Sequence, residues 1–78
     1  SQPPTVTVLG DVRQHVVAWS EGLTLAQAIT AAQHLRRIPP RAIILRRGNE
    51  AIRIQPEFLF QSGEDPALLP GDVIELLR

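Results

Sequence analysis

The chain closes on the stretch Leu68-Leu69-Pro70-Gly71-Asp72-Val73-Ile74-Glu75-Leu76-Leu77. Pro70 fixes φ near the value of the second position of a turn, and Gly71 can adopt the positive φ that a type II turn requires next. Asp72 can accept hydrogen bonds from nearby backbone N–H groups. The aliphatic run that follows predicts a final strand at the centre of a sheet, covered on at least one face.

The composition predicts one small globular domain. The chain has 78 residues, 44% of them hydrophobic, and a formal net charge of zero in which Arg supplies every basic side chain. A neutral chain argues against nucleic acid as a partner, because nucleic acid favours a basic face. Cysteine is absent, which excludes disulfides, thiol chemistry and zinc-finger sites. No apolar run has membrane-spanning length, and no signal peptide is visible.

The first part of the chain predicts a linker and a hairpin. We interpret residues 1–4 as a linker remnant, because Pro3-Pro4 resists both helix and sheet, and residues 5–78 as a single domain cut from a longer protein. Residues 5–9 alternate polar and apolar side chains and predict a strand. Gly10-Asp11 breaks that strand, and residues 12–19 form a second strand-like run, so a hairpin with a short connection is expected.

A helix follows. Thr24 fits an N-cap, and Gln27 completes a capping box. Helical spacing of apolar residues predicts a helix from about Thr24 to Leu35, with a buried stripe of Leu25, Ala28, Ile29, Ala32 and Leu35. Arg36 and Arg37 suit the negative end of its dipole. Pro39-Pro40 ends any continuation.

Two more strands and an ambiguous segment complete the chain. Residues 42–47 predict a strand that is buried along most of its length, residues 48–50 a turn, and residues 51–54 its partner strand. Residues 57–61 fit either a short helical turn or a short strand. We interpret Phe58 and Phe60 in that segment as core residues. Residues 62–66 are interpreted as a surface loop.

This order of elements predicts an α+β fold. One helix must lie across one face of a mixed sheet of four to five strands to bury its stripe. The last strand then runs between its neighbours, parallel to the first strand. That layout is a ubiquitin-like β-grasp.

Four pieces of the sequence stand in the order that is typical of one β-grasp family. They are Gly10-Asp11-Val12, then Glu21-Gly22-Leu23-Thr24-Leu25-Ala26-Gln27-Ala28-Ile29, then Ile43-Ile44-Leu45-Arg46-Arg47-Gly48, and finally Leu69-Pro70-Gly71-Asp72-Val73-Ile74. In these pieces, which extend over nearly the whole chain, the sequence resembles the soluble-ligand-binding β-grasp (SLBB) domain. Two connections depart from the family pattern: residues 14–16 replace a Pro-Gly in the first hairpin, and residues 32–35 replace an Ala-Gly-Gly helix end.

The resemblance implies binding and assembly. SLBB domains occur in outer-membrane polysaccharide exporters, where they build periplasmic rings, and also in cobalamin-binding, respiratory and DNA-uptake proteins. The expectation is therefore a domain of a bacterial envelope protein in the periplasm or at the outer membrane, reaching the membrane only through its parent protein. Its expected partners are polysaccharide and other copies or domains of that parent.

Four residues are candidates for ligand contact: His15, Trp19, Arg46 and Arg47. Trp19 offers a face on which sugars stack, or it is a core residue at a strand end. Arg46-Arg47 offers guanidinium groups to carboxylates, or it belongs to a solvated hairpin tip with Arg53, balanced by Glu50. His15 lies in the altered first hairpin.

No reaction is indicated, and the chain is expected not to be an enzyme and to carry no cofactor. His34 has no metal-ligating side chain at helical spacing and His15 has only Asp11, which is too few ligands for a site, so no metal is expected. Nothing orients a nucleophile, and no phosphate-binding glycine loop is present.

Other functional classes remain open. A general protein-interaction β-grasp module is the strongest rival. An RNA-binding TGS-like domain shares the Gly-Asp-Val-Ile ending and needs a basic face, which Arg36, Arg37 and Arg41 would have to form. Sulfur-carrier β-grasp proteins end in Gly-Gly, whereas this sequence ends in Leu-Leu-Arg.

Overall fold

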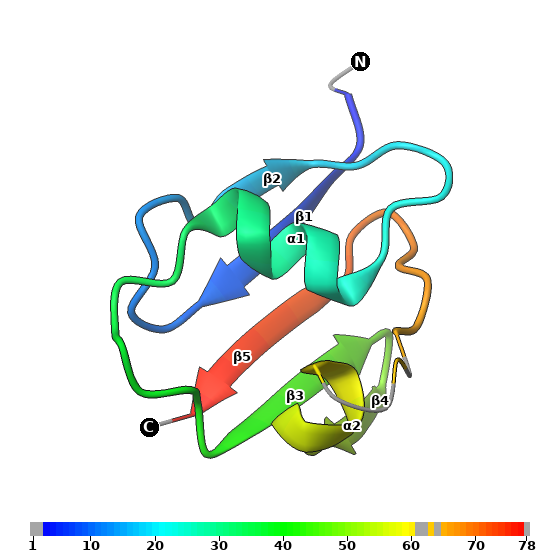
Figure 1. Cartoon of the computed structure of the whole chain (residues 1–78). Coiled ribbons are helices and arrows are strands. Elements are labelled where there is room, and N and C mark those ends of the chain that lie inside the picture. Colours follow the sequence, from blue (N-terminus) through cyan, green and yellow to red (C-terminus); the bar gives the residue numbers. More distant parts are fainter. Residues whose placement is uncertain (1–2, 61–62, 64, 78) are drawn as a thin grey trace.

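A computed structural model describes residues 3–60, 63 and 65–77 of the chain. Their elements are β1 (Thr5–Leu9), β2 (Val16–Ala18), α1 (Leu25–Ala32), β3 (Ala42–Arg47), β4 (Glu50–Ile54), α2 (Pro56–Phe60) and β5 (Val73–Leu77). The strands form one five-stranded mixed sheet in the order β2-β1-β5-β3-β4, with β5 parallel to β1 and antiparallel to β3 (Figure 1). Neither described helix has the length and apolar character needed to cross a membrane.

The closing turn and the central strand are confirmed. Gly71 has a φ of 87°, as a type II turn requires at that position. The Asp72 N–H donates to the Leu69 carbonyl at 3.1 Å. β5 then lies between β1 and β3, where Ile74 is fully buried and Leu76 nearly so. The predicted parallel pairing of the last strand with the first is therefore also confirmed.

The start of α1 is as predicted, and its end is not. Thr24 and Gln27 exchange both capping-box hydrogen bonds. The helix stops at Ala32 because Gln33 takes the left-handed conformation, with a φ of 62°. The backbone N–H groups of residues 13 and 14 then donate to the Ala32 carbonyl at 3.0 Å, which satisfies the helix end. Leu35 is consequently 63% exposed, so its assignment to the buried stripe was wrong.

The rest of that stripe packs on the sheet. Leu25, Ala28, Ile29 and Ala32 are all buried in one cluster with the side chains of the β-strands. The strand members of this cluster are Val6, Val8, Val17, Ile43, Leu45, Ile74 and Leu76. This is the core of the domain.

The first hairpin differs from its prediction. Only Val16–Ala18 of the predicted run of residues 12–19 forms a strand, which pairs antiparallel with β1. Val12 instead bridges His34, beyond the helix. Gly10 bends the chain at a φ of 130°, and a Cβ there would meet the Leu76 carbonyl oxygen at 3.0 Å. Residues 10–15 therefore form a connection that packs against the end of α1.

Residues 56–60 form a short helix, which resolves the ambiguous segment. Pro56 and Leu59 are buried, whereas Phe58 is 50% exposed, so the interpretation of Phe58 as a core residue was wrong. The side chain of Phe60 and residues 62 and 64 of the predicted loop lie outside the described part of the chain, as does half of the predicted linker.

The sheet has one covered face and one open face. Both helices lie on the same side of it (Figure 1), and their buried residues share one core cluster. The alternate strand positions point to the other side, which we call the open face. The arrangement is an α+β fold compatible with a β-grasp.

Candidate functional site

The segment of residues 65–72 joins α2 to β5 and runs beside the start of α1. The Leu25 N–H donates to the Pro66 carbonyl at 3.0 Å, and the Leu68 N–H donates to the Leu23 carbonyl at 2.8 Å. Asp65 accepts a further hydrogen bond, from the Ala26 N–H at 2.8 Å. The segment is thus held to the helix N-terminus by main-chain and side-chain bonds together.

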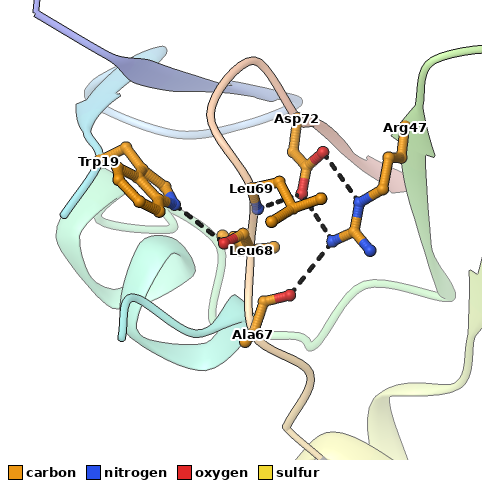
Figure 2. A network of polar contacts seen from close by, with 6 residues as sticks. All are labelled: Trp19, Arg47, Ala67, Leu68, Leu69 and Asp72. Atoms are coloured by element: carbon orange, nitrogen blue, oxygen red, sulfur yellow. Dashed lines mark hydrogen bonds and ion pairs between the residues drawn. The ribbon is translucent and has the colours of Figure 1, made fainter. Parts of the chain in front are cut away.

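Asp72 and Arg47 fix the other side of this segment (Figure 2). Arg47 Nε donates to Asp72 Oδ1 at 3.2 Å, and Arg47 Nη2 donates to Asp72 Oδ2 at 2.9 Å. The same Nη2 donates to the Ala67 carbonyl at 3.1 Å, and the Leu69 N–H donates to Asp72 Oδ2 at 2.8 Å. One bidentate ion pair therefore ties β3 to the closing turn.

The Asp72 carboxylate is 2% exposed, while the Arg47 side chain keeps about a third of its surface in solvent. Burial by itself raises the pKa of Asp72. The hydrogen bonds from Arg47 and from the Leu69 N–H, with the Arg47 charge, outweigh burial, so the pKa of Asp72 lies below its ordinary value. The hydrogen bond to Asp72 raises the pKa of Arg47. Both groups are charged at neutral pH.

Trp19 holds the same segment from the opposite side. Its indole Nε1 donates to the Leu68 carbonyl at 2.9 Å, and its half-buried ring packs against the core cluster (Figure 2). Trp19 and Arg47, predicted as ligand contacts, thus both bind the closing segment of their own chain. A role of either in ligand binding stays a prediction.

Arg46 points to the open face, where it pairs with Glu75. The strand register places Arg46 opposite Val73, Val73 opposite Thr7, and Thr7 opposite Val16. These four residues form one row across the open face. The row mixes a cation, a hydroxyl and two aliphatic side chains.

His15 lies at the first-hairpin end of that row, directly before Val16. Its ring is exposed, and its Nδ1 lies 3.0 Å from the Val8 carbonyl oxygen. The structure therefore divides the four predicted residues. Arg46 ends the open-face row and His15 directly precedes Val16 at its other end, whereas Trp19 and Arg47 lie on the helix side.

Within the part of the chain that the structure describes, no group of three or more His, Cys, Asp or Glu side chains is placed to hold a metal ion. The two histidines make different contacts. Nδ1 of His15 lies within hydrogen-bond distance of a β1 carbonyl oxygen, and the main chain of His34 forms a β-bridge with Val12.

The ion pair between Arg47 and Asp72 was not predicted from the sequence. The sequence feature that could have placed Arg47 is strand alternation, because Arg47 stands two residues after the buried Leu45 and so shares the helix side of β3. That places its guanidinium on the side of the closing turn, away from the open face that Arg46 occupies. No alternation links Arg47 to a residue 25 positions later, because that contact depends on the β3–β5 register.

No protein-family model matches the sequence, and no curated protein matches it.

Proposed function

We propose that this chain is a non-catalytic binding and assembly domain of a bacterial envelope protein, of the kind that serves capsule or exopolysaccharide export. Its fold would be the ubiquitin-like β-grasp of an SLBB domain. Polysaccharide and other copies or domains of the parent protein would be its partners. The domain would lie in the periplasm or at the outer membrane, where its parent protein would hold it.

Two features support the fold part of the proposal. The four SLBB-like pieces stand in the family order. The third piece supplies β3, and the fourth supplies the turn and start of β5, which lie side by side in the sheet. A central last strand parallel to the first, with one main helix on a single face, is the layout that a β-grasp requires.

The observation that carries the binding part is the open face. Its central row runs from Val16 beside the first hairpin to Arg46, so it joins the two regions in which ligand contact was predicted. The surface is mixed in character, which suits weak contact with an extended chain. Several copies in one assembly would raise the overall affinity by effective concentration.

An NMR titration of the labelled domain with acidic and neutral oligosaccharides tests this proposal. Amide shifts clustered around His15, Trp19 and Arg46 are the expected result. Arg46→Gln should weaken the response to acidic sugars, with Arg37→Gln as a matched control, because Arg37 lies in the connection beside α1 and away from the open face. An absence of shifts at millimolar sugar would overturn the glycan part of the proposal.

A general protein-interaction module is the second candidate, and the mixed open face favours it equally. Concentration-dependent shifts of the domain alone, confined to the open face and without any response to sugar, would select it. RNA binding that falls steeply with added salt would reject both candidates in favour of a TGS-like function.

A further inference from the structure

A groove lies between the last turn of α1 and the connection that leads to β3. These two elements meet at the end of the domain where α1 stops (Figure 1). Its volume is about 420 Å³, within the range of about 300–1,000 Å³ that ligand sites occupy. Ile29, Pro39 and Pro40 supply its apolar lining, Arg36 and Arg37 supply its cationic side, and His34 lies between them. None of the described residues that line it is acidic.

The walls of the groove are fixed by the main chain. Gln33 donates to the carbonyls of Ile29 and Thr30 at 3.2 Å, and the Leu35 N–H donates to the Asp11 carbonyl at 2.8 Å. Farther along, the Arg41 N–H donates to the Leu77 carbonyl at 2.8 Å, which returns the connection to the sheet. The two prolines between these anchors have restricted φ. A ligand would therefore meet a largely preformed surface.

Positive charge gathers around this groove. Arg13 lies next to it, since its N–H donates to the carbonyls at the end of α1. Arg36 pairs with Asp11 at 3.3 Å, with both side chains partly exposed. Among the described residues no ion pair engages Arg13, Arg37 or Arg41. Three arginines without a described ion pair therefore belong to the connections at this end of the domain, whereas Arg53, also without one, lies on β4.

We propose that this groove binds an acidic peptide segment of a partner protein, with carboxylates on Arg36 and Arg37 and an aliphatic side chain on Ile29, Pro39 and Pro40. The inference goes beyond the proposed function and does not require that the parent protein exports polysaccharide.

The lining favours a peptide over the other anionic partners. A neutral sugar is held mainly by hydroxyl and amide groups or by stacking on a Trp, Tyr or Phe ring. The groove has no such ring, and its one hydroxyl, on Thr30, already donates to the Ala26 carbonyl at 2.9 Å. A single-stranded nucleic acid is commonly held by stacking on Phe, Tyr or Trp as well as by cations, and this lining contains none of these three residue types. Carboxylates suit Arg forks, and aliphatic side chains suit the proline and isoleucine surface.

The test uses a short synthetic peptide in which glutamates flank two leucines, added to the labelled chain at low salt. The expected result is a set of amide shifts in residues 29–37. The affinity for the peptide should be severalfold lower at high salt, because exposed charges are screened. A peptide with glutamine in place of glutamate should produce at least tenfold weaker binding. Equal binding of both peptides would overturn the inference.

Two matched pairs of variants locate the site. Arg37→Glu should weaken binding at least tenfold, while Arg53→Glu, with the same change in net charge on exposed β4, should leave it within twofold. Thr30→Glu should block the groove, while Ala31→Glu, one position along the exposed side of α1, should not. Unchanged spectra elsewhere establish that each variant is folded. Equal losses within each pair would overturn the inference.

Other anionic partners serve as competing outcomes. Binding of anionic phospholipid vesicles without binding of the acidic peptide would assign the cations to a membrane surface and overturn the inference. Shifts in residues 29–37 with uronic-acid oligosaccharides but not with the peptide would also overturn it. A response to sugar on the open face alone bears on the proposed function and not on this groove.

Discussion

Two connections of this domain use arginine in opposite ways. The segment of residues 65–72 is bound by side chains: Trp19 holds one carbonyl, and Arg47 holds another together with the Asp72 carboxylate. The connection of residues 34–40 is bound mainly by its main-chain ends, and Arg37 at its middle has no ion pair among the described residues. An arginine that pairs with a buried carboxylate, such as Arg47, stabilises the fold. An arginine without such a pair, such as Arg37, can bind a partner.

The largest expected effect comes from removing that carboxylate. Asp72→Ala would leave the Leu69 N–H and the Arg47 guanidinium without their acceptor, and we expect the free energy of unfolding to fall by about 3 kcal/mol. That value is at the low end for a broken buried pair, because Arg47 keeps contact with water. Urea unfolding measures it. A loss below about 1 kcal/mol would contradict the role assigned to Asp72.

The next effect separates two neighbouring arginines. Arg47→Ala should cost about 2 kcal/mol, because Asp72 stays buried without its main partner. Arg46→Ala should cost less than about 1 kcal/mol, since its pair with Glu75 lies on the open face in contact with solvent. Urea unfolding of both variants measures the difference. Equal losses would contradict the division of the two residues between the fold and the surface.

The pH dependence of stability sharpens the same comparison. Because the pKa of Asp72 is lowered in the folded chain, its contribution is fully present above the unfolded pKa of about 3.9 and is lost as pH falls through the folded pKa. The stability difference between the natural chain and Asp72→Asn should therefore be largest at neutral pH and should shrink below about pH 4. Urea unfolding across this range measures it. A difference that does not vary with pH would contradict the assignment.

The smallest effect is expected in the other connection. Leu35→Ser and Ile38→Ser remove side chains that are 63% and 68% exposed. Each should change the free energy of unfolding by no more than about 0.5 kcal/mol, as surface substitutions usually do. Thermal unfolding measures this. A loss of several kcal/mol would show that the connection packs against the core and is not a free surface.

Local sequence signals predicted the parts of the fold that depend on local chemistry. Pro70-Gly71 indicated the turn, and Thr24 with Gln27 indicated the helix start, because both patterns act within a few residues. The end of α1 was missed because Gln33, and not a glycine, adopts the left-handed conformation there. Apolar Leu35 then continued the helical spacing without being buried.

The candidate site was predictable only in its surface part. Strand alternation is enough to separate Arg46 from Arg47 once β3 is known. The use of Trp19 and Arg47 depends on contacts across 49 and 20 or more positions of the chain, which follow from the strand register and have no local signature. The cationic groove likewise arises because the helix ends early and sends residues 34–40 across its last turn.

The most direct test of this division measures acidic-peptide binding for Arg37→Glu and Arg47→Ala side by side, at a temperature where both are folded. We predict that Arg37→Glu binds at least tenfold more weakly with unchanged stability. Arg47→Ala should lose stability but bind within twofold of the natural chain. Equal loss of binding in both variants, or loss in Arg47→Ala alone, would contradict the central claim. That claim is that Arg47 stabilises the segment of residues 65–72, whereas Arg37 is exposed on the connection of residues 34–40 and binds the peptide.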